Sequence, residues 1–278
     1  MKRQVSQLKE KSIMDKYTQI FPLEYTAKPC NRIYLHKNQF HVIKQTKTDS
    51  EQIFLKEFKQ RHNHYPTHPH ITECELVNIE DTEVIKMPYH QKDMFELIMD
   101  GKRFKEKEVI RFAYELALAI NYWHKHNVLY ADLKLENICL NDNHIKLIDF
   151  DRCKFIEADE ELTVYSSTTA SMPPEIIFNV LNRHRPKDHI GYGKEVDWWS
   201  YGVVIYELTY GIHPFHLGNE TPNQVAQNIL YREPQKTQKV IDHRLKDLLD
   251  SLLVKVRTKR LKIDRDVLEH PVFESLRE

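Results

Sequence analysis

The segment LYADLKLEN, at residues 129–137, contains three residue types that phosphoryl transfer needs. A carboxylate such as Asp132 can orient an attacking hydroxyl, and an ammonium such as Lys134 can neutralise charge on a moving phosphoryl group. The amide oxygen of Asn137 can ligate Mg²⁺. The run HIKLIDFD follows and contains a second carboxylate, Asp149, which is another candidate Mg²⁺ ligand. Asp and Asn are also common in solvated turns, so this spacing alone leaves an ordinary turn as the alternative.

The elements that must position these residues change in character near Pro88. Before it, short alternating runs predict strands, and SEQIFLKEFKQRH predicts a helix over residues 50–62 with Ser50 as a possible N-cap. After Pro88 the apolar spacing becomes helical. The predicted strands lie within 22–45 and at Glu75–Ile79 and Glu83–Met87, and the predicted helices lie at 106–126, 195–210, 222–231 and 240–255.

A mainly β front half and a mainly helical rear half predict an α+β protein. We expect two lobes: a small, mainly antiparallel N-lobe with one main helix at residues 21–88, and a larger, mainly helical C-lobe at 89–278. Weak helical spacing in residues 1–20 predicts a helical N-terminal extension. A cleft between two lobes would be a natural ligand site.

The composition excludes several classes of protein. The formal net charge is zero, so no global attraction to nucleic acid or to a membrane surface is expected. The four cysteines form no C-x-x-C pair, which favours a reducing compartment. The basic N-terminus is not followed by an apolar run, and no stretch approaches the roughly 18 apolar residues of a membrane span. We therefore expect an intracellular protein of the cytoplasm, the nucleus or both.

Several motifs in register resemble a known family. DLKLEN resembles the D-L-K-P-E-N catalytic loop of protein kinases, and IDFD resembles their metal-binding D-F-G segment. The other matching segments are HVIK, KMPYHQKDMFELI, SMPPEII, VDWWSYGVVIYELTYGIHPF and RLKIDRDVLEHPVF. Their order and spacing agree from about residue 22 to residue 275. The sequence is therefore similar to the eukaryotic-type Ser/Thr protein kinase domain, and the two-lobed kinase fold is expected.

The resemblance implies a set of catalytic and metal-binding roles. Asp132 is implied as the catalytic base and Lys134 as the cation at the γ-phosphate. Asn137 and Asp149 are implied as ligands of Mg²⁺. Thr168, five residues before the first proline of PPE, is implied to serve the catalytic loop. The lysine of DLKLEN and this threonine favour Ser/Thr over Tyr as the acceptor.

A second set of residues is implied to bind ATP. Lys44 should hold the α- and β-phosphates, and its carboxylate partner should lie on the helix 50–62. Glu57 fits the family's distance to the turn HPHI best, and Glu51 is the alternative. The remaining ATP-site residues implied are Ile33, Val42 and Cys139 around the adenine, Met87 as gatekeeper, Tyr89 in the hinge and Asp93 at a ribose hydroxyl. The family also implies an ion pair between Glu175 and Arg260.

Three departures from the family pattern bear on activity. Thr26, Lys28 and Asn31 stand where the phosphate-covering loop has glycines, and no glycine occurs in the first hundred residues. This change is expected to weaken ATP binding, because glycines allow the backbone to approach phosphate closely. Ala131 replaces the arginine that usually reads a phosphate on the activation segment. Asp151 replaces the glycine of D-F-G.

These observations leave two hypotheses. The first is an active Ser/Thr kinase that uses ATP and Mg²⁺ on protein substrates, with basic or Arg-rich sites favoured because Glu136 and Asp93 should face the substrate. The second is a pseudokinase, a kinase-shaped scaffold or regulatory binding module. The motif drift also resembles the compact kinases of large DNA viruses, especially the late-acting kinases of insect baculoviruses. Neither direct nucleic-acid binding nor membrane binding is expected.

Overall fold

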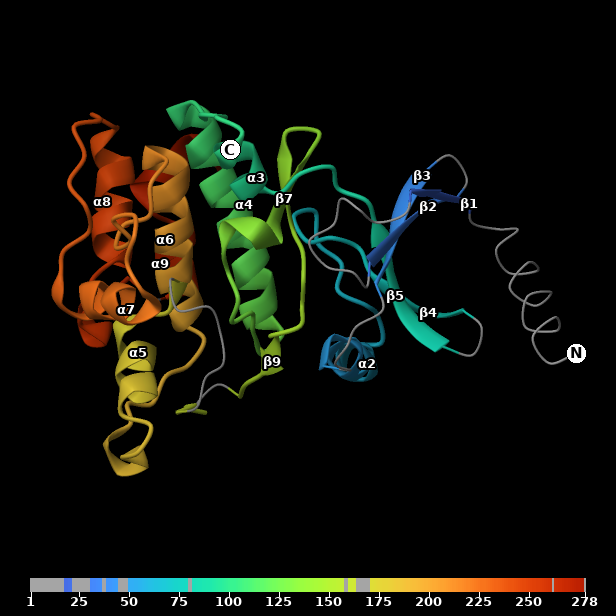
Figure 1. Ribbon diagram of the computed structural model, residues 1–278, viewed down its shortest axis with the longest axis horizontal. Coiled ribbons are helices and arrows are strands. Elements are labelled where there is room, and N and C mark those ends of the chain that lie inside the picture. The colour runs from blue at the N-terminus through green and yellow to red at the C-terminus, as the bar shows by residue number, and fades with distance from the viewer. Residues whose placement is uncertain are drawn as a thin grey trace, which may run out of the picture. The chain divides into compact units, whose positions relative to one another are not determined.

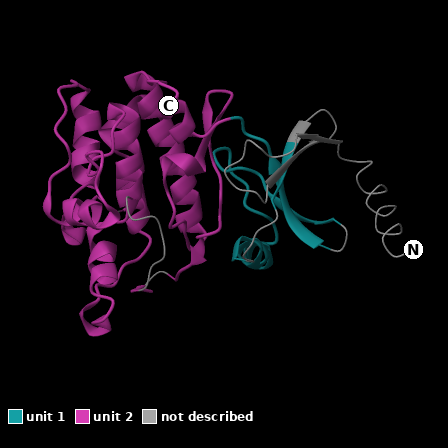
Figure 2. Cartoon of the chain, viewed as in Figure 1, with its two compact units in different colours: residues 1–91 teal, residues 92–278 magenta. Residues whose placement is uncertain are grey.

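The computed structural model describes residues 18–21, 31–36, 39–44, 50–79, 82–157, 160–163, 171–261 and 263–277, and Figure 1 labels its elements. The chain divides into two compact units, Met1–Gln91 and Lys92–Glu278 (Figure 2). The first unit is built mainly on an antiparallel sheet and the second is mainly helical. This division confirms the predicted α+β class.

The first unit contains a five-stranded antiparallel sheet with the order β1-β2-β3-β5-β4. Its elements are β1 Thr18–Phe21, β2 Asn31–His36, β3 Gln39–Lys44, α2 Ser50–His62, β4 Glu75–Ile79 and β5 Thr82–Pro88. The helix α2 has the predicted bounds. Residues 18–20 were predicted to be part of a helical extension, but they pair with β2 as part of β1. The β-branched and aromatic residues of TQIF suit a strand, and the pairing with a neighbouring strand outweighs the weak helical spacing.

Alternation along β3 decides which side chains reach each face of this sheet. Ile43 packs with Val84 on one face, and Val77 and Ile79 extend the same apolar cluster. Lys44, the next residue, therefore projects from the opposite face. The helix α2 buries a stripe at positions 51, 54, 55 and 58, which is the i, i+3, i+4, i+7 spacing of one helical face. This stripe includes a carboxylate, Glu51.

The second unit is organised around the buried helix α6, which packs beside α4 (Figure 1). Trp198, Trp199 and Tyr201 of α6 are fully buried, and α4 contributes Phe112 and Trp123 to the core. The helices are α3 Met94–Met99, α4 Glu106–Lys125, α5 Pro174–Leu181, α6 Val196–Tyr210, α7 Pro222–Tyr231, α8 His243–Leu252 and α9 Asp264–Leu268. The helices predicted at 106–126, 195–210, 222–231 and 240–255 are thus confirmed to within three residues at either end.

Two short β-ribbons in the second unit carry the residues that were predicted to do chemistry. Strand β6 Val128–Leu129 pairs with β9 Lys154–Phe155, and β7 Ile138–Asn141 pairs with β8 His144–Leu147. The loop between β6 and β7 carries Asp132, and the loop between β8 and β9 carries Asp149. Among the residues described, no helix is long and apolar enough to cross a membrane.

Candidate active site

Asp132, Lys134 and Asn137 meet in one tight loop, as their spacing predicted. The ammonium Nζ of Lys134 donates to Asp132 Oδ2 at 2.6 Å. The amide Nδ2 of Asn137 donates to the same oxygen at 3.0 Å and to the backbone oxygen of Asp132 at 2.8 Å. Asn137 is buried, whereas the Asp132 carboxylate remains partly exposed. A carboxylate, a cation and an amide therefore converge with one carboxylate oxygen as their shared centre.

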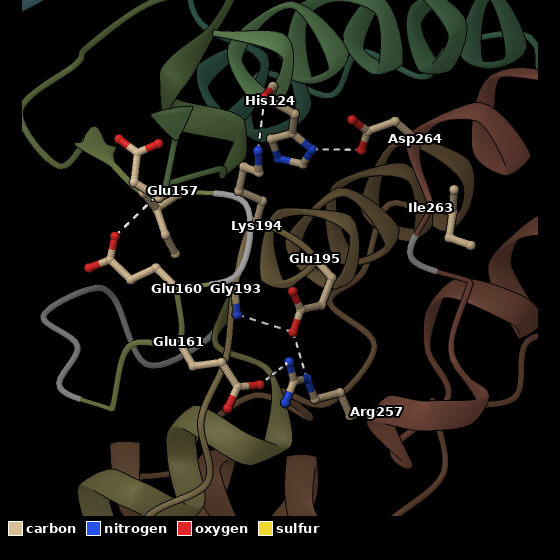
Figure 3. Close-up of a pocket in the computed structure, with 11 residues that line it drawn as sticks. His124, Glu157, Glu160, Glu161, Gly193, Lys194, Glu195, Arg257, Ile263 and Asp264 are labelled. Atoms are coloured by element: carbon tan, nitrogen blue, oxygen red, sulfur yellow. Dashed lines mark hydrogen bonds and ion pairs between the residues drawn. The ribbon is translucent and has the colours of Figure 1, made fainter. Parts of the chain in front are cut away.

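This loop is held by hydrogen bonds to the start of α6. Asp197, which is buried, accepts the backbone N–H of Tyr130 on Oδ2 and that of Ala131 on Oδ1, both at 2.9 Å. His124, at the end of α4, contacts Asp197 Oδ2 through Nε2 at 3.1 Å. It also contacts Asp264 Oδ1 through Nδ1 at 2.7 Å, as Figure 3 shows. Burial disfavours the charged imidazolium, but the hydrogen bonds and charges of Asp197 and Asp264 outweigh it and raise the pKa of His124 to about 9. The ends of α4 and α6 thus hold the loop through one charged network.

A second pair of hydrogen bonds connects this loop to the segment that carries Asp149. The hydroxyl of Tyr130 donates to the backbone oxygen of Ile148 at 2.5 Å. The N–H of Ile148 donates to the backbone oxygen of Asn137 at 2.9 Å. Tyr130 is fully buried, and its hydroxyl still has a hydrogen-bond partner. The two segments with candidate Mg²⁺ ligands are therefore fixed to each other.

In the first unit, Lys44 forms an ion pair with Glu51, and both side chains are buried. The prediction that Glu57 is the partner was wrong. Glu57 lies on the outer side of α2 and accepts from Arg61 Nε at 2.9 Å, one turn along the helix. Distance from the turn HPHI could not separate two glutamates on one helix, but the buried stripe of α2 does, because it includes position 51 and omits 57.

Three of the predicted ATP-site residues, two adenine contacts and the gatekeeper, lie in one row across the sheet. Ile33 of β2 is the register partner of Val42 in β3, and Val42 is the register partner of Met87 in β5. Paired residues in antiparallel strands share a face, so Val42 and Met87 project to the same side as Lys44. The side chain of Ile33 lies outside the described residues. Tyr89 follows β5 and is half-buried.

The two predicted nucleotide contacts of the second unit are neighbours. Asp93 and Cys139 form an isolated antiparallel bridge. Asp93 caps α3 by accepting the N–H of Glu96 at 2.8 Å, and burial raises the pKa of its carboxyl. Burial also raises the pKa of the Cys139 thiol to about 12, so this cysteine is a neutral apolar group. Both properties suit the edge of a nucleotide site, and the contacts with adenine and ribose remain predictions.

The donor set of this loop fits Mg²⁺. The nitrogen of the Asn137 amide is directed at Asp132, so the atom that remains to meet a cation is the oxygen Oδ1. Asp149 supplies a carboxylate on the adjoining segment. Oxygen ligands of these two types are the ones that Mg²⁺ prefers. Thr168, Thr26 and Lys28 lie outside the described residues, so their predicted places stay predictions.

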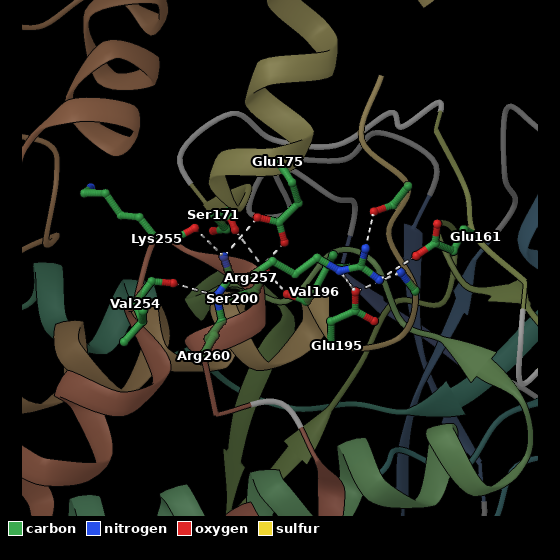
Figure 4. A network of polar contacts seen from close by, with 12 residues as sticks. Glu161, Ser171, Glu175, Glu195, Val196, Ser200, Val254, Lys255, Arg257 and Arg260 are labelled. Atoms are coloured by element: carbon green, nitrogen blue, oxygen red, sulfur yellow. Dashed lines mark hydrogen bonds and ion pairs between the residues drawn. The ribbon is translucent and has the colours of Figure 1, made fainter. Parts of the chain in front are cut away.

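The predicted ion pair between Glu175 and Arg260 is confirmed (Figure 4). Arg260 Nη1 donates to Glu175 Oε1 at 2.8 Å and Nη2 donates to Oε2 at 2.9 Å. Both groups are almost fully buried, and the guanidinium also lies over the ring of Trp199. A bidentate buried pair of this kind fixes the end of the 149–175 segment to the helical unit.

Sequence reasoning missed one acidic residue beside the catalytic loop. Burial raises the pKa of Glu207, on α6, to about 8, and the charge of Glu136 in DLKLEN adds to this effect. Two carboxyl groups from distant parts of the sequence therefore lie close enough to repel. The signal was present in the sequence as one of two acidic residues in the otherwise mainly apolar helix α6, but nothing in the sequence placed it beside Glu136.

Comparisons with known proteins agree with this fold. Residues 28–273 match the protein kinase domain. The human ribosomal protein S6 kinase alpha-4 is 37% identical over 193 residues, which cover 66% of this chain and 24% of that protein. The Caenorhabditis elegans serine/threonine-protein kinase sgk-1 is 33% identical over 186 residues, which cover 65% of this chain and 37% of that protein. The chain belongs to the protein kinase family, and it matches less than two-fifths of the length of these relatives.

Proposed function

We propose that this chain is an active serine/threonine protein kinase that transfers the γ-phosphoryl group of ATP to protein hydroxyls. The observation that carries the proposal is the convergence of Lys134 and Asn137 on the carboxylate of Asp132. The buried pair of Lys44 and Glu51 in the other unit supports it. Two similar proteins that are named serine/threonine-protein kinases, from Caenorhabditis elegans and Xenopus laevis, support the choice of acceptor.

Each residue has a separable task in this reaction. Asp132 orients the acceptor hydroxyl and takes up its proton, and Lys134 offsets negative charge that moves between the attacking and leaving oxygens. Lys44 holds the triphosphate, and Glu51 keeps its ammonium in place. Asn137 and Asp149 would hold Mg²⁺, which supplies charge neutralisation at the phosphates when it is bound. Positioning and electrostatics account for most of the catalysis in this class of reaction.

A pseudokinase is the alternative, favoured by Ala131, Asp151 and the glycine-free segment near Thr26. The discriminating experiment is incubation with Mg²⁺, radiolabelled ATP and a generic basic protein, followed by identification of the labelled amino acid. We expect label on Ser and Thr, and a loss of about a thousandfold or more in Asp132→Asn. Asp142→Asn, an exposed aspartate in the β7–β8 turn, is the matched control. A wild type that labels no protein, or an Asp132→Asn variant as active as the control, would support the pseudokinase.

We also propose that basic residues beside the acceptor are favoured. Glu136 is exposed, Glu207 lies close to it, and Asp93 contributes a third carboxyl group to the same unit. Arginine pairs well with such carboxylates because its fork of N–H groups matches two oxygens. These groups would act on substrates through charge complementarity.

This preference should depend on pH through Glu207. Its pKa of about 8 means that it gains negative charge as the pH rises from 7 to 9. The KM for an Arg-containing peptide, relative to the same peptide with Ala, should therefore fall over this range. Glu207→Gln should abolish the pH effect and raise the KM for the Arg peptide by about fivefold, since a pair that stays in contact with water contributes roughly 1 kcal/mol. Glu274→Gln, which removes an exposed glutamate elsewhere, is the control. Equal phosphorylation of acidic and Arg-rich peptides would contradict the proposal.

The narrower similarity to baculovirus kinases and a place of action in the cytoplasm or nucleus remain predictions from the sequence.

A further inference from the structure

The activation segment is the stretch from Asp149 to Glu175, and a short part of it, residues 160–163, is hydrogen-bonded to residues 190–192. Leu162 and Tyr192 form an isolated antiparallel bridge in which each N–H donates to the other's backbone oxygen, at 2.8 and 2.9 Å. The side chain of Asn179, which is buried on α5, extends this contact. Its Nδ2 donates to the backbone oxygen of Thr163 at 3.1 Å, and its Oδ1 accepts from the N–H of Ile190 at 2.7 Å. The two segments are thus joined by one backbone bridge and by the side chain of Asn179.

Arg257 connects the same two segments through its side chain (Figures 3 and 4). Its Nη2 donates to Glu161 Oε1 at 2.8 Å, and its Nη1 donates to the backbone oxygen of Gly191 at 2.7 Å. Its Nε donates to Glu195 Oε1 at 2.6 Å, just before α6. Every nitrogen of the guanidinium therefore has a different partner. Lysine, with one ammonium, could not reproduce this arrangement.

Gly191 permits the close approach of Glu161. A Cβ atom placed on Gly191 would lie 2.1 Å from Oε2 of Glu161 and 2.7 Å from its carboxyl carbon. No real Cβ is found so close to another atom, so any side chain at 191 would displace the carboxylate. The observed position of the Glu161 carboxylate therefore uses space that glycine leaves open at 191, in a chain that has only six glycines.

We propose that Arg257 is a positioning residue that holds the activation segment in its substrate-binding arrangement without a phosphate. The inference rests on the proposed kinase function. Ala131 cannot bind a phosphate, so a phosphorylated segment would lack the arginine that the family resemblance implies at that position. Arg257 instead pairs with Glu161, whose carboxylate is present without any phosphorylation. Arg257 is partly exposed, in the wall of a cavity of about 540 Å³, so its contacts are open to water. Removing its side chain should therefore weaken the hold on the activation segment only moderately.

Amide hydrogen exchange tests the fastening directly, and it does not depend on catalysis. The N–H groups of Leu162 and Tyr192 report it because each donates across the bridge. We expect their exchange to be about tenfold faster or more in Arg257→Ala, in Arg257→Lys and in Gly191→Ala. The last variant changes no charge. Arg265→Ala removes an equal charge from an exposed site and is the control. The exchange rate of the Leu116 amide, in the core of α4, should be the same in the wild type and in all these variants.

Peptide kinetics test the positioning role. We expect the KM for a peptide substrate to rise about tenfold in Arg257→Ala and Gly191→Ala, while the KM for ATP stays within about twofold. Phosphatase-treated wild type should retain its initial rate. The proposal is overturned if the amides of Leu162 and Tyr192 exchange at the wild-type rate in both Arg257→Ala and Gly191→Ala. It is also overturned if the amide of Leu116 exchanges faster by the same factor, or if the peptide KM of these two variants equals that of the wild type. A tenfold fall in rate after phosphatase treatment would also overturn it. A wild type without transfer activity would defeat the proposed function, and this positioning role with it, even if the exchange result showed that the fastening exists.

Discussion

Two residues with left-handed backbone lie at the chemically important positions. Ala131 and Asp149 both have φ of 66°, although neither is glycine. Such a conformation costs on the order of 1–2 kcal/mol per residue. The cost at Ala131 is offset by Asp197, which accepts the N–H groups of Ala131 and of its neighbour Tyr130. The buried carboxylate of Asp197 is therefore a positioning group, because it fixes the backbone that carries Asp132.

The ion pair of Lys44 with Glu51 predicts how two glutamate variants should differ in their use of ATP. Glu51→Gln removes the carboxylate that holds a buried ammonium in place, so the kcat/KM for ATP should fall at least about tenfold, roughly 1.4 kcal/mol. Glu57→Gln should stay within about twofold, because Glu57 pairs only with the exposed Arg61 on its own helix. Initial rates at several ATP concentrations separate the two variants. A Glu57→Gln variant whose kcat/KM for ATP is lower than that of Glu51→Gln would favour Glu57 as the partner of Lys44, as the sequence had predicted.

Local spacing and the family resemblance decided how much of the site the sequence could predict. Asp132, Lys134 and Asn137 are near neighbours in the chain, so their proximity followed from one loop. Asp197 holds that loop from 67 residues away, and Arg257 reaches Glu161 across 96 residues. No periodicity reports contacts of this kind. These positioning residues could be found only from the fold.

At the scale of elements, periodicity was a reliable guide where one face is buried. Helix α2 has the predicted bounds because its apolar stripe is regular, and α7 begins at a proline after Thr221, which caps it. The failure was β1, where a four-residue strand pairs at the sheet edge. A strand so short carries too little pattern to compete with a helical reading of its surroundings.

The network that joins α4, α6 and α9 predicts a dependence of stability on pH. His124 has a pKa of about 9 in the folded protein and about 6.5 when unfolded. The charged form is thus stabilised by folding, so its contribution is complete below about pH 6.5 and is lost as the pH rises through about 9. The loss is on the order of 3 kcal/mol at most.

Urea unfolding at several pH values between 6 and 9.5 measures this effect. His124→Gln should be less stable at pH 6 and should show a flatter curve. His243→Gln, which changes an exposed histidine, should keep the wild-type dependence. A wild-type free energy of unfolding that is constant or rises between pH 6.5 and 9 would show that His124 is not charged between its two aspartates.

At the scale of the whole molecule, the family match from residue 28 to residue 273 includes parts of both units. The first unit contributes the pair of Lys44 and Glu51, and the second contributes the Asp132 loop and Asp149. Neither unit holds the complete proposed set of catalytic residues. We therefore propose that both sets of residues serve one reaction, the Mg²⁺-dependent transfer of phosphate to a protein hydroxyl.

The most direct test is the rate of Mg²⁺-dependent phosphate transfer from ATP to a Ser/Thr peptide in Asp149→Ala and Asp151→Ala. The two aspartates are two residues apart in the same segment, and only Asp149 is assigned to Mg²⁺. We predict that Asp149→Ala loses about a thousandfold or more of the rate with its fold intact, and that Asp151→Ala stays within about threefold. An Asp149→Ala variant with the wild-type kcat would contradict the proposed active site.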